Sequence, residues 1–217
     1  HLRVLDAMYG MSGVAGAIGW CMSDYNTHKD FGSGDRICYH GVMDMFRLPK
    51  EAASAYLSQQ DEIPVMEVAS SMDPGERTRS DLDSVYVFTN CDAVKLYKNG
   101  EYIGTYFPDR AQFPNLPHPP VFISDFIGNL IERNEGYSKR DAERIKRIFF
   151  AIIRYGDKSL PLKYKLSMAL EMLRHGMSYK DAVALFERYV TVWGCESTEY
   201  VFEGYIGDKL VATCRKS

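Results

Sequence analysis

SVYVFTNCDAVKLYKNGEYIGTY, residues 84–106, is the stretch that decides the fold. Its runs 84–89, 93–98 and 102–106 are rich in β-branched and aromatic residues, as short strands are. Asn99-Gly100 stands between the last two runs and is the strongest two-residue signal for a β-hairpin, because such turns need a positive φ that Asn and Gly tolerate. The stretch therefore predicts consecutive strands, two of them joined as a hairpin.

More strands are expected on either side of this stretch. Residues 65–69 have strand character, and a second hairpin follows near the end, where Gly207-Asp208 joins 200–205 to 209–214. Short strands separated by turn signals are typical of a β-sandwich. We therefore predict one sandwich, built from residues 61–121 and 191–217.

A stretch of another kind interrupts this sandwich. It opens with FPNLPHPPVF at 113–122 and continues with helical periodicity. The predicted helices span 124–134, 139–155, 162–175 and 178–190. Ser138 and Ser178 each stand three residues before an Asp, as in capping boxes. We interpret residues at about 122–190 as a helical insertion, with a third independent domain as the alternative.

The first part of the chain, residues 1–60, has a different rhythm. Leu2 to Tyr9 repeats apolar side chains at helical spacing, and Val14 to Trp20 is a continuous apolar run, typical of a parallel strand buried on both faces. The polar, Gly-rich SDYNTHKDFGSGDR at 23–36 predicts a long loop, and Glu51 to Gln59 predicts a helix. Helix, strand, loop and helix are the rhythm of a βα-barrel, which makes the predicted fold class α+β.

Composition and charge exclude several kinds of partner. The net charge is −3 and Lys and Arg are scattered, so no nucleic-acid partner is expected. No apolar run approaches the roughly 20 residues that cross a bilayer, and no signal peptide is visible, so no membrane partner is expected. His1 is not an initiator Met, and we expect the natural start upstream. The cysteines show no CxxC spacing, which predicts reduced thiols and a cytoplasmic location. They are Cys21, Cys38, Cys91, Cys195 and Cys214.

Several long stretches resemble family 2 glycoside hydrolases, specifically the bacterial β-galactosidase-like members. They are GWCMSDYNTHKDFGSGDRICYHGVMDMFRLPKEAA at 19–53, VYVFTNCDAVKLYKNG at 85–100, PLKYKLSMALEMLRHGMSYKDAVALFERYVTVWG at 161–194 and TEYVFEGYIGDKLV at 198–211. The resemblance implies that residues 1–60 are the end of a (β/α)8 or TIM barrel. It implies that residues 61–217 are an Ig-like sandwich with the helical insertion. The implied reaction is hydrolysis of terminal β-galactosides with retention, without a cofactor.

The resemblance places the catalytic carboxylates of the family outside this chain. The family uses a Glu acid/base after the fourth barrel strand and a Glu nucleophile after the seventh, and both would precede His1. We therefore expect no catalytic residue here and no hydrolysis by the chain alone. The eighth strand carries an aromatic residue beneath the sugar, and Trp20 matches it.

The chemistry of the residues agrees with a sugar site at this strand end. An indole stacks on the C–H-rich face of galactose, while short polar side chains hydrogen-bond the hydroxyl groups. The predicted substrate-binding residues are Trp20, Asp24, Asn26 and His28. Core packing is the alternative for Trp20, and hydrogen bonds that stabilise the loop are the alternative for the other three.

The same loop invites two other interpretations. His28, Asp30, Asp35 and His40 have metal-ligand side chains, but the intervening glycines and the lack of helical spacing favour loop structure, so no metal is expected. Asp24 and Asp35 could be read as a glycosidase carboxylate pair, although two Asp in one polar loop are common.

A function of a different class remains as the alternative. Residues 61–217 could be a carbohydrate-binding or interaction module, or a scaffold, without catalysis. An exposed aromatic row on a sheet face would favour binding, whereas Trp193 and the aromatics of the last hairpin are predicted to be sandwich core. The sequence leaves open whether the sugar is galactose, glucuronic acid or mannose, and whether the protein is a homo-oligomer.

Overall fold

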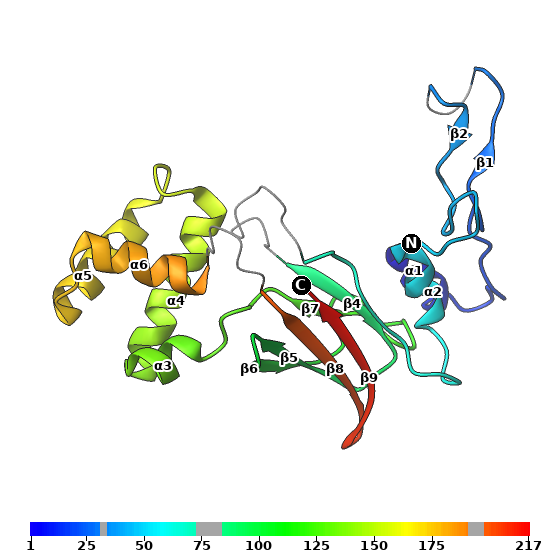
Figure 1. Cartoon of the computed structure of the whole chain (residues 1–217). Helices are drawn as coiled ribbons and strands as arrows, with labels where there is room; N and C mark the ends of the chain where they lie inside the picture. Colours follow the sequence, from blue (N-terminus) through cyan, green and yellow to red (C-terminus); the bar gives the residue numbers. More distant parts are fainter. Residues whose placement is uncertain (31–33, 73–83, 191–197) are drawn as a thin grey trace.

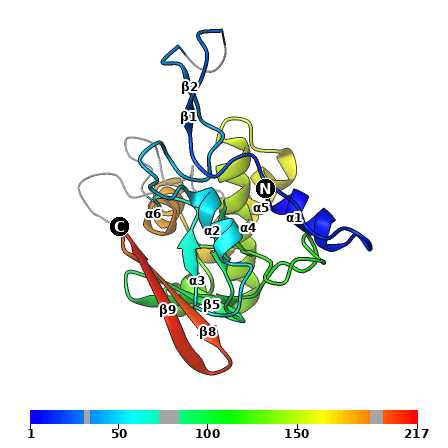
Figure 2. The ribbon, with the colours of Figure 1, turned by 90° about the vertical axis from the view of Figure 1, so that its right-hand side faces the viewer.

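The computed structural model describes residues 1–30, 34–72, 84–190 and 198–217. Its described part is an α+β fold with antiparallel sheets, as predicted. The elements lie in a row, with a group of helices at one end, two sheets in the middle and residues 1–60 at the other end (Figure 1). In the perpendicular view of Figure 2, one hairpin of the central sheets and one ribbon of the N-terminal part extend in opposite directions.

The smaller central sheet has the order β3-β4-β7. Its strands are β3 (Met66–Val68), β4 (Val85–Thr89) and β7 (Val121–Ile123). The first two lie inside predicted strands, but β7 lies where the sequence predicts a proline-rich connection. Pro119 and Pro120 come directly before β7, where proline costs no hydrogen bond within the sheet. Val85 and Ile123 then face each other across the β4–β7 pair.

The larger central sheet has the order β6-β5-β8-β9. Its strands are β5 (Ala93–Lys98), β6 (Glu101–Tyr106), β8 (Tyr200–Ile206) and β9 (Lys209–Lys216). Asn99 and Gly100 have φ values of 50° and 78°, so the predicted hairpin turn is confirmed. The second predicted hairpin is confirmed by the pairing of β8 with β9. Because β5 pairs with β8, the last hairpin lies beside the first one.

The two sheets share one hydrophobic core. Alternate side chains of their strands point inward, and Val87 of β4, Leu96 of β5 and Phe202 of β8 are 0% exposed within a single cluster. Burying one such side chain stabilises the fold by roughly 1.5–3 kcal/mol. Two sheets facing each other over one core are what a sandwich requires, while the assignment to the Ig-like type stays a prediction.

The central segment is helical, as predicted. The helices are α3 (Leu130–Glu135), α4 (Lys139–Tyr155), α5 (Leu162–His175) and α6 (Tyr179–Tyr189). Ser138 and Ser178 cap α4 and α6 by accepting hydrogen bonds from the N–H groups of Asp141 and Asp181. The predicted helix over 124–134 is wrong in its first half. There the Asp125 carboxylate accepts the N–H groups of Ile127 and Gly128, a local turn that competes with helix.

The helices and the sheets are not separate in their packing. Leu130, Phe149 and Leu185 belong to the same buried cluster as the strand residues. Lys146 of α4 donates hydrogen bonds to the Asp125 carboxylate and to the Gly128 carbonyl, both at 2.9 Å. That residues 61–217 form one domain with an insertion at about 122–190 stays a prediction. The helices of this insertion share their core with the sheets.

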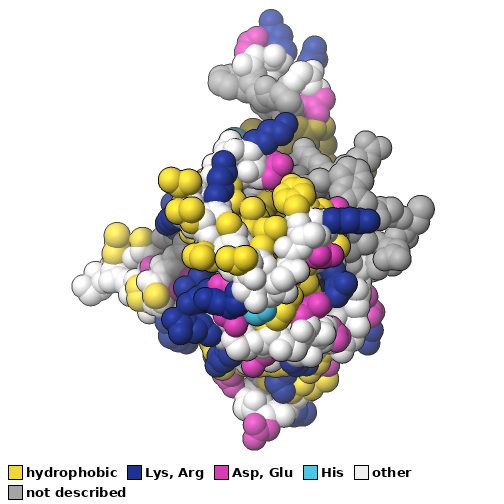
Figure 3. Space-filling view, turned by 90° about the vertical axis from the view of Figure 1, so that its left-hand side faces the viewer, with side chains coloured by type: hydrophobic (Ala, Val, Ile, Leu, Met, Phe, Trp, Pro, Cys, Tyr) yellow, Lys and Arg dark blue, Asp and Glu magenta, His cyan; other side chains and the backbone are white. Residues whose placement is uncertain are grey.

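Part of the helical end is apolar and uncovered. Four leucines of α5 are 58% to 81% exposed; they are Leu162, Leu166, Leu170 and Leu173. Figure 3 shows hydrophobic side chains gathered on this face of the molecule. A cavity of about 670 Å³ lies between α4, α5 and α6. No helix in the described ranges is both long enough and apolar enough to cross a membrane.

The N-terminal part contains α1 (Leu2–Tyr9), a ribbon of β1 (Tyr25–Asn26) and β2 (Ile37–Cys38), and α2 (Glu51–Leu57). Both helices lie within predicted ranges. The side chain of Leu5 packs against Phe113 and Leu116. The Asp6 carboxylate accepts the N–H groups of Asn115 and Leu116, which fixes α1 to the proline-rich connection.

The predicted buried strand over 14–20 is wrong. No described residue pairs with this segment as a strand, and Ile18 is 100% exposed. A strand buried on both faces needs a neighbouring strand and covering helices, and the described residues supply neither for this segment. The apolar run is therefore extended and open, and it leads directly to Trp20.

Candidate functional site

The predicted sugar site begins at the exposed side chain of Trp20. This residue is 73% exposed, and the Trp20–Cys21 peptide bond is cis. The indole N–H donates a hydrogen bond of 3.2 Å to the Tyr25 hydroxyl, and the two rings meet edge to face with centroids 6.2 Å apart. The indole is thus fixed by its edge, while its faces stay open to a ligand.

Backbone hydrogen bonds hold the loop around Trp20. The N–H groups of Val42 and Met43 donate to the carbonyls of Cys21 and Met22, and the Asp24 N–H donates to the Met43 carbonyl. A Cβ on Gly41 would lie 2.3 Å from the Asp24 nitrogen, so only glycine fits there. The chain after Trp20 therefore lies tightly against residues 41–43.

Asp24 is the best-anchored side chain of the loop. Its carboxylate side chain is 2% exposed and accepts hydrogen bonds from the Gly41 N–H at 2.9 Å and from the Lys50 ammonium at 2.7 Å. A buried carboxylate with two donors is stable because its charge is paired and its lone pairs are used. Asp24 therefore has the contacts expected of a residue that stabilises the loop, which was the alternative to a direct sugar contact.

Asn26 and His28 lie beyond this anchor and are exposed. Asn26 pairs with Ile37 in the β1–β2 ribbon, with no side-chain partner among the interactions described for it. The His28 Nδ1 atom lies 3.1 Å from the Asp30 carboxylate. The polar groups of Asn26 and His28 are accessible to a ligand. The β1–β2 ribbon connects both residues to the loop of Trp20, and neither side chain contacts Trp20 in the interactions described.

Tyr25 and Cys38 complete this site; Tyr25 belongs to the polar set that follows Trp20 in the sequence, whereas the sequence did not single out Cys38 as a ligand. They are direct partners across the ribbon. A hydrogen bond with the Cys38 thiol is the main cause of a raised pKa of the Tyr25 phenol, and the Trp20 indole N–H acts in the opposite direction. The Cys38 thiol also contacts His40 Nδ1 at 3.4 Å. Their separation in sequence hides this contact, because it depends on the register of the ribbon.

The metal and carboxylate-pair interpretations of this loop find no support in the described residues. His28 is next to Asp30, whereas Asp35 interacts with the Tyr39 hydroxyl. Asp24 is engaged by Lys50. Within the described ranges, no three metal-ligand side chains of this loop come within coordination distance of one another.

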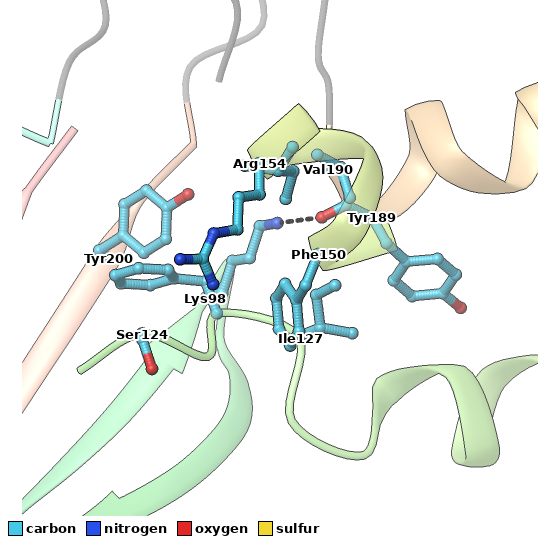
Figure 4. Close-up of a pocket in the computed structure, with 10 residues that line it drawn as sticks. Lys98, Ser124, Ile127, Phe150, Arg154, Tyr189, Val190 and Tyr200 are labelled. Carbon is cyan, nitrogen blue, oxygen red and sulfur yellow. Dashed lines mark hydrogen bonds between the residues drawn. The ribbon is translucent and has the colours of Figure 1, made fainter. Parts of the chain in front are cut away.

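A second cavity lies where the helices meet the larger sheet. It has a volume of about 250 Å³ and is lined by apolar side chains with two cations, Lys98 and Arg154. Figure 4 shows the side chains of Lys98 and Arg154 projecting into this cavity. The Lys98 ammonium donates a hydrogen bond of 3.0 Å to the Tyr189 carbonyl. This bond joins β5 to the end of α6.

Sequence comparison identifies the relatives of the chain. No protein-family model matches it. The β-galactosidase of Thermoanaerobacterium thermosulfurigenes is 50% identical over 126 residues, which are 57% of this chain and 18% of that protein. The β-galactosidase of Thermoanaerobacter pseudethanolicus is 48% identical over 127 residues, 57% of this chain and 17% of that protein. The matched part of the chain is thus similar to the corresponding part of these β-galactosidases.

Solved structures agree on the fold of this β-galactosidase relative. Bacteroides uniformis β-glucuronidase 3 and Parabacteroides merdae β-glucuronidase each match 100% of the chain with a TM-score of 0.53. Their identities are 13% and 15%, and the match covers 19% of each of those chains. Over its whole length the chain therefore has the fold of the matching part of these two β-glucuronidases. The chain spans less than a fifth of the length of the two β-galactosidases it matches.

Proposed function

We propose that this chain is part of a retaining β-galactosidase and contributes Trp20 to the subsite in which the terminal galactose is bound. One observation carries the proposal: an indole that is 73% exposed and fixed by Tyr25 stands in a chain of which 126 residues align with a β-galactosidase at 50% identity. An open indole face matches the C–H-rich face of galactose.

The other residues of the loop take separate roles in this proposal. Tyr25 fixes the edge of the indole, and Asp24 positions the loop through its bonds to Gly41 and Lys50. Asn26 and His28 are exposed and supply hydrogen-bond donors and acceptors to sugar hydroxyl groups. Rigid placement of the platform matters because a small displacement of a bound substrate slows its reaction strongly.

The proposal includes the barrel and the sandwich. Residues 1–60 would be the end of a (β/α)8 barrel, and residues 61–217 an Ig-like sandwich with its helical insertion. The exposed apolar run 14–20 supports the first part, since neighbouring barrel strands would cover both of its faces. The shared core of the two sheets supports the second part.

The chain by itself should not hydrolyse galactosides. Retaining hydrolysis needs two carboxyl groups about 5–5.5 Å apart, one as nucleophile and one as acid. In the loop, Asp24 is held by Lys50 and Asp35 interacts with Tyr39, so neither is placed as half of such a pair. Release of nitrophenol from an aryl β-galactoside by the purified chain measures this. Turnover within about a hundredfold of a full-length β-galactosidase would overturn the assignment of the carboxylates.

The role of Trp20 is tested in a longer protein that contains this chain and is active. Trp20→Ala should lower kcat/KM on the order of 10²-fold or more, because stacking and positioning are lost together. Trp20→Phe should retain more activity than Trp20→Ala. The matched control is Phe107→Ala, which removes another exposed aromatic side chain away from this loop. Equal activity of Trp20→Ala and the parent protein would refute the platform role.

A second candidate function has one observation in its favour. Tyr97 and Tyr102 form an edge-to-face pair on the larger sheet, with centroids 5.7 Å apart, and Tyr205 lies on the same sheet with Lys95 4.1 Å over its ring. Such a row supports a carbohydrate-binding module in residues 61–217. Affinity electrophoresis in galactan gels tests it: Tyr102→Ala should abolish retardation of the chain. Absence of retardation of the parent chain would exclude this candidate.

A further inference from the structure

Three metal-ligand side chains meet where α4 begins and α5 ends. Asp141 lies in the first turn of α4, and Glu171 and His175 are spaced i, i+4 in the last turns of α5. One atom from each side chain lies within 4.8 Å of the others. The His175 Nε2 atom is 3.5 Å from the Glu171 Oε2 atom and 3.8 Å from the Asp141 Oδ2 atom.

Two of these atoms are buried without a hydrogen-bond partner. Glu171 is 3% exposed, and both its Oε2 atom and the His175 Nε2 atom have no hydrogen bond in the described part of the chain. Buried polar groups are normally satisfied, because an unpaired buried acceptor loses its water without compensation. The two unpaired atoms face each other, so one small ligand between them would satisfy both.

The surroundings fix these side chains in place. Arg174 donates hydrogen bonds to Asp141 Oδ1 and Glu171 Oε1 at 3.0 and 2.9 Å, and Arg144 donates to Glu171 Oε1 at 3.2 Å. The Arg contacts thus use the first oxygen of each carboxylate, and the second oxygen of each lies towards His175. The Tyr137 ring packs on the His175 ring with centroids 4.5 Å apart. Partners of this kind orient the ligands in metal sites.

Asp141 is prepared to act as an anionic ligand. The Ser138 hydroxyl donates a hydrogen bond of 2.7 Å to its Oδ2 atom. This bond is the main cause of a lowered pKa of Asp141, with Arg174 acting in the same direction. The Ser138 bond also holds this carboxylate in position beside His175.

We propose that Asp141, Glu171 and His175 form a Zn²⁺ site that ties the start of α4 to the end of α5, with water as the fourth ligand. Zinc accepts one imidazole and two carboxylates in a tetrahedron with bonds of about 2.0–2.2 Å, which places ligand atoms about 3.3–3.6 Å apart. The two separations from His175 Nε2, 3.5 and 3.8 Å, need little contraction, and all three ligand atoms lie within 4.8 Å of one another. Ca²⁺ and Mg²⁺ fit less well, since they take six or more ligands and prefer oxygen.

The two arginines limit the affinity of this site. Asp141 and Glu171 carry two negative charges, which the guanidinium groups of Arg144 and Arg174 already balance. A divalent cation is repelled by both groups, so we expect micromolar rather than nanomolar affinity. Its effect is structural, because it crosslinks two helices whose ends are otherwise joined by ion pairs.

The test uses the whole 217-residue chain after treatment with a chelator. Calorimetric titration with ZnCl₂ should show one equivalent bound, and MgCl₂ should give no signal. Co²⁺ should give the visible absorption of a tetrahedral site with nitrogen and oxygen ligands. Zinc at saturation should also raise Tm by several degrees, on the order of 3–5 °C, because it binds the folded state alone.

Variants locate the site. His175→Gln and Glu171→Gln should each weaken Zn²⁺ binding at least about tenfold, since ligands and their partners contribute that much or more. His118→Gln is the matched control: its Nε2 atom contacts a single carboxylate, that of Asp61, at 2.7 Å, and the change should leave binding unaltered. Circular dichroism checks that each variant is folded.

Several outcomes would overturn the proposal. One is absence of Zn²⁺ binding by the parent chain at millimolar metal. Another is unaltered binding in both Gln variants, which would place the metal at the cysteines or another histidine. A third is binding of zinc without any rise in Tm, which would contradict a site that ties α4 to α5. If the variants fail to fold, anomalous diffraction from zinc-soaked crystals of the parent chain tests the site. A peak about 2.0–2.2 Å from His175 Nε2 would support the proposal, and the absence of such a peak would overturn it.

Discussion

The N-terminal part and the central sheets use similar apolar sequence with opposite results. In residues 1–60, Ile18 is 100% exposed and Phe46 is 87% exposed. In the sheets, Val87, Leu96 and Phe202 are all 0% exposed. Both regions contain apolar stretches, so the presence of an apolar stretch does not by itself distinguish them. The sheets have partner strands within the described chain, and the run at 14–20 has none.

This difference shows that an apolar run specifies burial only together with its partners. The strands β4, β5 and β8 pair with neighbours and face a second sheet, which removes their side chains from water. The N-terminal part is held instead by individual contacts, chiefly the Asp24–Lys50 pair within it and the contact of Leu5 with Phe113 outside it. Stability should therefore be concentrated in the sheets.

The largest expected effect is at Phe202. Phe202→Ala should lower the free energy of unfolding by about 3–5 kcal/mol, because it leaves a cavity in the shared core. Phe46→Ala is the matched change in the N-terminal part and should alter it by no more than about 0.5 kcal/mol. Urea unfolding followed by circular dichroism measures both. Similar losses for the two variants would break the comparison.

Gly128 tests the junction of helices and sheets. It has a φ of 56°, and an added Cβ would lie 2.2 Å from the Ile103 carbonyl oxygen, so Gly128→Ala should cost about 2–4 kcal/mol. Gly136→Ala, at a φ of 70° and with open space, should cost about 1 kcal/mol. Gly16→Ala in the N-terminal part should be close to neutral. The same unfolding assay ranks the three, and equal costs at Gly128 and Gly136 would contradict the clash.

Asp24 sharpens the comparison inside the N-terminal part. Asp24→Asn removes the charge that Lys50 and the Gly41 N–H share, and local opening of the loop should become easier by about 1–3 kcal/mol. The free energy of global unfolding should stay within about 0.5 kcal/mol of that of the parent protein, because the Asp24 anchor is outside the shared core. Hydrogen exchange of the Gly41 amide should be faster, whereas Asp35→Asn should leave it unchanged. Unchanged exchange in Asp24→Asn would mean that the backbone bonds alone hold the loop.

The smallest expected effect is at alkaline pH. Burial raises the pKa of Tyr106, so the folded state favours the neutral phenol. Its contribution is complete below the unfolded-state pKa near 10 and is lost as pH rises towards the folded-state pKa, by up to about 1.4 kcal/mol per pH unit. Tyr106→Phe should flatten the fall in stability between pH 10 and 11. Equal slopes for Tyr106→Phe and the parent protein would contradict this prediction.

Local signals were sufficient for most elements of the fold. Asn99-Gly100 predicted its hairpin, and Ser138 and Ser178 predicted the starts of α4 and α6, because turns and caps depend on a few neighbouring residues. The strand β7 and the open run 14–20 were predicted wrongly, since both depend on whether a distant strand pairs with them. Trp193 and Cys195 lie outside the described residues, so their predicted burial stays a prediction.

The sequence was sufficient to predict which residues form the candidate site, but not which contacts they make. Trp20 and the polar loop were evident from the sequence. Of the aromatic residues in the last hairpin, Tyr200 and Phe202 are buried as expected, whereas Tyr205 is only partly buried. The bond between Asp24 and Lys50 and the contact between Tyr25 and Cys38 depend on how the loop folds back. The cluster around His175 joins two helices, and no spacing in one of them reveals the partner in the other.

The pairing of β5 with β8 also determines an order of events during synthesis. A ribosome makes β5 and β6 first, then the four helices, and only afterwards β8 and β9. Until then one edge of β5 has unpaired N–H and C=O groups, which can recruit another chain in a crowded polysome. The rapidly formed helices shorten the distance that the last hairpin must span, which lowers the entropy cost of closing the sheet. A translational pause after residue 190 would lengthen the exposure of that edge, and a chaperone that binds extended strands would act at this moment of nascent-chain folding.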